Sequence, residues 1–82
     1  MSEMHQPLRQ LADRELAALA NDAVTELSRR GSPESFKLLV ELSAQVGASL
    51  GEAARQLAAS GSWSQVADIT GTTKQAAWSR WR

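Results

Sequence analysis

Residues 61–82 (GSWSQVADITGTTKQAAWSRWR) contain two helix start signals separated by one glycine, and this spacing constrains the fold more than any other feature. Ser62 predicts a helix N-cap, and Gln65 three residues later predicts a capping box. Gly71 predicts the end of that helix, because a helix C-terminus often needs positive φ, which glycine adopts at little cost. Two short helices joined by such a tight turn are typical of a helix-turn-helix.

The second helix of this pair is capped by Thr72 or Thr73 and runs to the end of the chain, over residues 73–82. Ala77 and Trp81 stand four residues apart and therefore share one face, which we expect to be buried. The side chains that can form hydrogen bonds lie away from that face: Lys74, Gln75, Ser79 and Arg82. This division favours a DNA-reading helix, and a plain helical hairpin is the alternative.

Three runs within this segment match a known pattern: SWSQVA (62–67), GTTKQAA (71–77) and Arg80-Trp81. They resemble the helix-turn-helix of small bacterial DNA-binding proteins, which is related in shape to the promoter-reading helix-turn-helix of sigma factors. The resemblance covers about the last quarter of the chain, and residues 1–60 resemble no family. Thr72 departs from the pattern, because the position after the glycine is usually apolar.

The resemblance implies a role for each polar residue of the second helix. It makes Thr73, Lys74 and Gln75 the leading readers of base edges and places Arg80 and Arg82 near phosphates. The chemistry agrees, since lysine donates to guanine O6 or N7, glutamine pairs bidentately with adenine, and phosphate contacts set register without reading sequence. The candidate DNA-binding residues are Thr72, Thr73, Lys74, Gln75, Ser79, Arg80 and Arg82.

All three tryptophans fall within this segment. We expect Trp63 and Trp81 to belong to the core, with Trp63 packed on the preceding helix. Trp78 lies nearer the exposed side, and two roles stay open for it: a lid over the core, or a contact with DNA sugar and phosphate.

Residues 1–60 predict two long helices, so the fold class is all-α. The first helix should begin near Pro7, a residue suited to a first turn, and end near Arg30, with Gly31 as its stop. Ser32-Pro33-Glu34 begins the second helix, which we expect to run to about residue 59. A break near Gly47, with Ser49 and Glu52 capping a new helix, is the competing model.

The second long helix carries apolar or small residues at alternating intervals of three and four, here called the heptad face: Phe36, Leu39, Ser43, Val46, Leu50, Ala53 and Leu57. So long a helix needs a partner for this face. We expect residues 1–60 to form a dimerisation scaffold for the DNA-binding segment 61–82, with Phe36, Leu39, Val46 and Leu50 at the interface. The alternative is an antiparallel hairpin that buries these residues within one chain.

Composition excludes several classes of function. The chain has 82 residues, no cysteine and one histidine, His5, so we expect no metal site, cofactor or catalytic group. No apolar run is long enough for a membrane span, and the N-terminus lacks the features of a signal peptide, so we expect a cytoplasmic, nucleoid-associated protein. Residues 1–60 hold six basic and eight acidic side chains, whereas residues 61–82 hold three and one. The positive end therefore coincides with the expected reading helix.

These observations together predict a transcriptional regulator that binds double-stranded DNA as a homodimer and has no evident small-molecule ligand. Two alternatives stay open. One is a protein-protein adaptor that uses the helix-turn-helix and the heptad face as docking surfaces. The other is a nucleoid-architectural protein that binds many DNA sites weakly.

Overall fold

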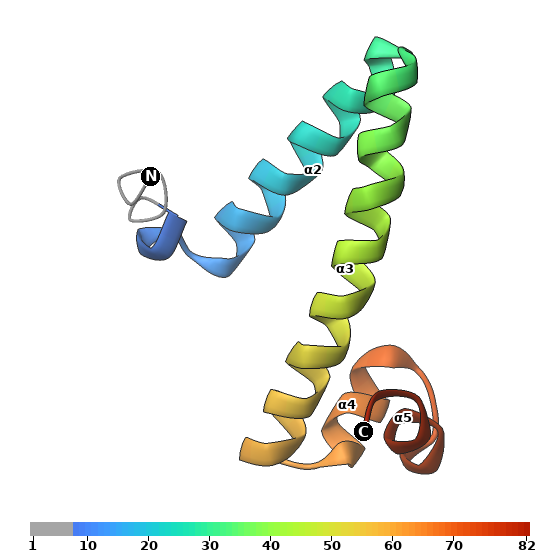
Figure 1. The fold of residues 1–82 in the computed structure, drawn as a ribbon. Coiled ribbons are helices and arrows are strands. Elements are labelled where there is room, and N and C mark those ends of the chain that lie inside the picture. The colour runs from blue at the N-terminus through green and yellow to red at the C-terminus, as the bar shows by residue number, and fades with distance from the viewer. Residues whose placement is uncertain (1–7) are drawn as a thin grey trace. The chain divides into compact units, whose positions relative to one another are not determined.

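The computed structural model describes residues 8–82, which form helices and contain no strand (Figure 1). After a helical turn at residues 8–10 come α2 (Asp13–Arg30), α3 (Pro33–Ser60), α4 (Trp63–Thr70) and α5 (Lys74–Trp81). The predicted all-α class is therefore confirmed for this part of the chain. His5 and Pro7, to which the sequence assigned a tail and a helix start, lie outside the described residues.

The prediction of one unbroken helix from near Pro7 to Arg30 is wrong, because the chain breaks at Leu11 and Ala12. The Leu11 N–H closes a turn onto the Leu8 carbonyl (3.2 Å), and Ala12 is extended, with ψ of 158°. The Glu15 carboxylate then accepts a hydrogen bond from the Ala12 N–H (2.8 Å) and so supports a new helix start. Alanine is a poor N-cap, and for this reason the start was not evident from the sequence.

The chain divides into two compact units, residues 1–41 and 42–82. In the first unit, α2 ends as predicted at Gly31, whose φ is +58°. The predicted cap Ser32 is also confirmed: its hydroxyl accepts from the Ser35 N–H, and the Ser35 hydroxyl accepts from the Ser32 N–H, both at 3.0 Å. Among residues 8–41 only Ser35 is buried, so this unit does not cover its own apolar side chains.

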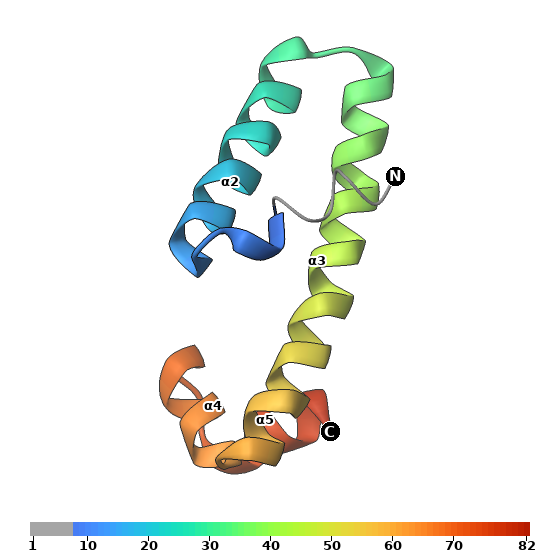
Figure 2. The ribbon, with the colours of Figure 1, turned by 90° about the vertical axis from the view of Figure 1, so that its left-hand side faces the viewer.

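In the second unit, α3 continues without a break through Gly47 and Gly51, so the competing model with a break near Gly47 is wrong. Ser49, the cap of that model, instead accepts a hydrogen bond from the Gln45 side chain (3.1 Å). Figure 2 shows α4 and α5 beside the C-terminal turns of α3. The core consists of Ala54, Val66, Ala67 and Ala77, with Leu57, Ala58, Trp63 and Trp81 packed around it.

The core meets α3 on a face beside the heptad face rather than on it. Gly51 and Ala54 are buried, whereas Leu50 and Ala53, which belong to the heptad face, are exposed. Of the residues predicted to form a dimer interface, Phe36 is 68%, Val46 62% and Leu50 47% exposed, and Leu39 is half-buried. Within residues 8–82 the heptad face is therefore largely exposed.

Candidate nucleic-acid interface

Helix α4 begins and ends at the residues that the sequence predicts. The Ser62 hydroxyl accepts a hydrogen bond from the Gln65 N–H (3.2 Å). The Gln65 side chain lies beside Gly61, and only this first bond of the predicted capping box forms in the turn. At the other end Gly71 has φ of +70°, and its N–H and that of Thr72 both donate to the Ala67 carbonyl.

Two threonines stabilise the turn between α4 and α5. The Thr70 hydroxyl lies 2.9 Å from the Val66 carbonyl, to which it donates, and 3.1 Å from the Thr72 hydroxyl. Thr72 therefore makes a polar contact across the turn. Thr70 was not among the predicted residues, because its role depends on the fold of the turn rather than on a local sequence pattern.

Small side chains bring α5 close to α4. The Thr73 hydroxyl accepts from the Ala76 N–H (3.1 Å), so Thr73 and not Thr72 is the N-cap of α5. One turn later Ala77 is only 1% exposed, and it packs in the core with Ala67 of α4. Ala77 and Trp81 thus form the inner face of α5, as predicted, although Trp81 is only half-buried.

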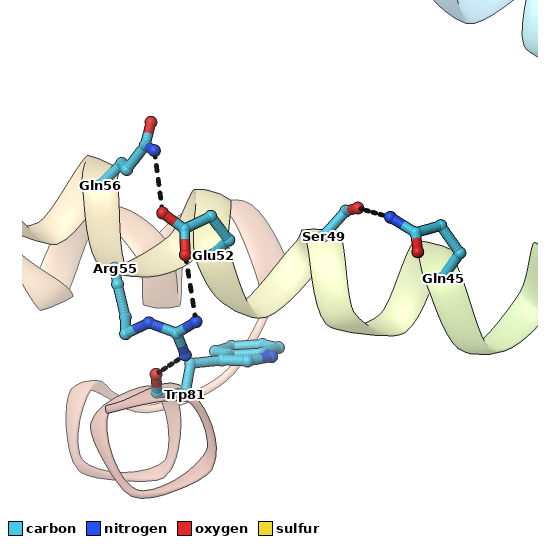
Figure 3. A network of polar contacts seen from close by, with 6 residues as sticks. All are labelled: Gln45, Ser49, Glu52, Arg55, Gln56 and Trp81. Atoms are coloured by element: carbon cyan, nitrogen blue, oxygen red, sulfur yellow. Dashed lines mark hydrogen bonds and ion pairs between the residues drawn. The ribbon is translucent and has the colours of Figure 1, made fainter.

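A polar network on α3 holds the C-terminal end of α5 (Figure 3). Arg55 donates from Nη1 to the Trp81 carbonyl (3.0 Å), and its Nη2 lies 3.5 Å from a Glu52 carboxylate oxygen. The other Glu52 oxygen accepts from the Gln56 side chain (3.0 Å). A Cβ at residue 51 would stand 3.4 Å from Arg55 Nη1 and 3.7 Å from Trp81 Cδ1, which is ordinary van der Waals contact, so this packing would also accommodate alanine.

All seven predicted DNA-binding residues are exposed. On a helix with about 100° per residue, Gln75 and Ser79 lie opposite the buried Ala77. The C-cap Arg82 projects about 20° from Gln75, whereas Lys74 and Arg80 lie about 60° from Ala77 on opposite sides of the helix. The hydroxyls of Thr72 and Thr73 are engaged within the turn and the cap, so the structure separates these two from the residues whose polar atoms face outward.

The arginines of α5 are ordered by aromatic rings. The Arg82 guanidinium lies 4.4 Å from the centre of the Trp78 ring, and the Arg80 guanidinium lies 5.1 Å from that of Trp81. Such cation–π contacts contribute about 0.5–1 kcal/mol at exposed sites. They hold each charge near the helix and leave its N–H edges free to bind an anion.

The electrostatics of this segment differ from those of α2 and α3. Helices α2 and α3 carry acids in their first turns (Asp13 and Glu15, and Glu34), whereas the first turns of α4 and α5 carry none. Both short helices therefore present N-terminal N–H groups whose positive potential no acid of that turn offsets. Within residues 8–82 no group of three potential metal ligands occurs, and no helix is long and apolar enough to cross a bilayer.

The chain matches no known family model, and no curated protein or solved structure is significantly similar to it.

Proposed function

We propose that α4 and α5 form a helix-turn-helix that binds duplex DNA, and that the protein is a homodimeric transcriptional regulator. The observation that carries this proposal is the outer face of α5. Its centre is polar, with Gln75, Ser79 and the C-cap Arg82, and a cation stands at each edge, Lys74 on one side and Arg80 on the other.

This pattern suits the major groove, where base edges lie between two phosphate strands. Gln75 at the centre can form the bidentate contact that adenine offers, and the flanking cations can each contact one strand. Lys74, at the first position of α5, can reach either guanine O6 and N7 or a phosphate. Thr72 and Thr73 contribute by fixing the turn and the start of α5, and we assign them no base contact.

The uncovered heptad face supports the homodimer. Among residues 8–82 the buried apolar residues are only Ala54, Val66, Ala67 and Ala77, and no large side chain is fully buried. So small a core is marginal for a chain of 82 residues. Association through the heptad face would enlarge it, and a net charge of zero places no electrostatic barrier in the way. A dimer also pairs two reading helices, which fits a palindromic site.

Selection from a random pool of duplex DNA tests this function. The wild-type protein should enrich a palindrome with half-sites about one helical turn (34 Å) apart. Replacing Lys74 and Gln75 together by alanine should abolish the enrichment and leave the helical circular dichroism unchanged, because both side chains are exposed. A matched control is Lys37→Ala/Gln45→Ala on α3, which removes the same side-chain types outside the proposed interface. Enrichment that survives the loss of Lys74 and Gln75 would reject α5 as the reading helix.

One observation favours the adaptor as a second candidate. A groove of about 190 Å³ lies between α3, α4 and α5, and nearly all of its lining is apolar, including Leu50, Leu57 and Trp81. Ile69 of α4 is 73% exposed and lines this groove. A folded protein that binds no duplex DNA, and that loses binding to a protein partner on Ile69→Lys, would support the adaptor. An architectural protein would instead bind random and selected DNA almost equally.

A further inference from the structure

A second hollow lies on the outer side of the α4–α5 pair, about 390 Å³ in volume and lined by Trp63, Lys74, Gln75 and Trp78. It is open, and it combines two indole rings with an ammonium group and a carboxamide. Trp63 comes from the first residue of α4, and the other three come from one side of α5. The apolar groove against α3 is lined by different residues, so the two depressions are distinct.

The walls of this hollow are held in place by contacts outside it. Trp63 is half-buried against the core, which fixes its ring. Trp78 is 42% exposed, and the Arg82 guanidinium lies over its ring at 4.4 Å. A tryptophan that serves only as a lid over the core would not need this exposure or a cation beside it. The ligand would therefore meet one ring, that of Trp63, that is already packed, which lowers the entropic cost of binding.

The hollow suits an anion that also has an apolar part, because cations stand beside two indole rings. Lys74 lines it, Arg82 stands beside Trp78, and none of the lining residues is acidic. A deoxyribose ring presents C–H groups that can pack on an indole face, and its phosphate oxygens accept from ammonium and guanidinium groups. Gln75 and Ser79 at the centre of the outer face of α5 would meet the bases. The hollow lies to the side of that centre, where the phosphate strand runs when α5 enters the major groove.

We propose that the hollow binds one sugar–phosphate unit of a DNA strand, with the deoxyribose against Trp78 and Trp63 and the phosphate on Lys74 and Arg82. This proposal rests on the proposed function and adds to it the part of the DNA that the Lys74 side of α5 contacts. It assigns Trp78 a contact that gives affinity without sequence discrimination. It also makes Trp63 part of the interface in addition to its place beside the core.

Affinity measurements on two kinds of duplex test the proposal, using the full chain and fluorescence anisotropy. Trp78→Ala should weaken binding to the selected duplex and to a random duplex by the same factor, roughly tenfold, as expected for one lost aromatic contact. Trp78→Phe keeps an aromatic ring at this position, and its affinity for both duplexes should fall less than that of Trp78→Ala. A single methylphosphonate at the contacted phosphate should weaken the wild type and have little further effect on Trp78→Ala.

Tryptophan emission gives a second readout that does not depend on the alanine variant folding. Binding of duplex DNA should change the emission of the wild type, and Trp63→Phe/Trp78→Phe should remove most of that change, because both rings line the hollow. Trp81→Phe, whose ring packs beside the core, is the matched control and should retain it.

Unchanged affinity of Trp78→Ala, or a loss confined to the selected duplex, would overturn the proposal while the proposed function stands. So would an emission change that persists undiminished in Trp63→Phe/Trp78→Phe. Absence of any duplex binding by the wild type would overturn both proposals, so the two failures are distinguishable.

Discussion

At the scale of single residues, the close approach of α4 and α5 depends on alanines. Ala67 is 3% and Ala77 1% exposed, and both belong to the buried core. A longer side chain at either position has no space in such a contact and would separate the two helices. Since α5 carries the residues proposed to bind DNA, this packing also determines how the reading face is presented.

Ala77→Leu should therefore lower the free energy of unfolding by about 1–3 kcal/mol, the usual cost of overpacking a core. Thermal or urea denaturation followed by circular dichroism measures this change. Ala76→Leu is the matched control, because Ala76 is the exposed neighbour on the same helix and should stay within about 0.5 kcal/mol of the wild type. Equal stabilities of the two variants would show that Ala77 is not a packed contact.

At the scale of elements, local sequence signals predicted most helix ends. Long-range contacts could not be predicted from the sequence. Ser32, Ser62, Gly31 and Gly71 act within one turn of their own positions, so the sequence suffices to identify them. Arg55 binds a carbonyl 26 residues away, and no local pattern encodes that bond. The exposure of Ile69 likewise depends on which side of α4 faces α3 and α5, which no local pattern encodes.

The continuity of α3 shows why single glycines are weak evidence for a helix break. Each costs roughly 0.5–1 kcal/mol relative to alanine, and neither Gly47 nor Gly51 interrupts the helix. The break at Leu11 and Ala12 shows the converse, because it occurs where no glycine or proline stands. The Glu15 contact with the Ala12 N–H was visible in the sequence only as an acid in a helical segment.

The two kinds of glycine give a paired prediction with opposite signs. Gly71→Ala should destabilise the protein by about 1 kcal/mol or more, because φ of +70° is strained for alanine. Gly47→Ala should stabilise it by about 0.5–1 kcal/mol, because residue 47 is inside a helix and nothing lies within 4 Å of the added methyl group. Urea denaturation of both variants checks the pair. A stabilising Gly71→Ala would contradict the left-handed turn between α4 and α5.

At the scale of the whole molecule, the heptad face is exposed, and we propose that a second copy of the chain covers it. The fold class follows from the sequence because alanine, leucine and repeated caps allow only helices. The partner of the heptad face cannot be predicted from the sequence, because periodicity identifies an apolar face without identifying what covers it. The structure shows that the core of the second unit does not cover this part of the heptad face, because Gly51 and Ala54 are buried whereas Leu50 and Ala53 are exposed.

We expect the wild type to sediment as a dimer at micromolar concentration and Val46→Lys to sediment as a monomer, because a lysine on the heptad face would have to be buried without a partner. Ala48→Lys is the matched control: residue 48 is exposed and lies about 160° around α3 from Leu50, away from the heptad face. Analytical ultracentrifugation distinguishes the species. A monomeric wild type would reject the proposed dimer. A dimeric Val46→Lys would show that the interface does not include Val46.

Duplex DNA binding, measured by fluorescence anisotropy across a salt titration with Lys74→Ala/Arg80→Ala alongside, is the decisive test of whether α5 binds DNA. If Lys74, Arg80 and Arg82 of both chains contact phosphates, the slope of log K against log salt should be about −5 for six contacts. The double variant, which retains Arg82 from each chain, should bind more weakly with a slope of about −2. No binding by the folded wild type at about 50 mM salt, or an unchanged slope in the variant, would contradict the claim that α5 binds DNA.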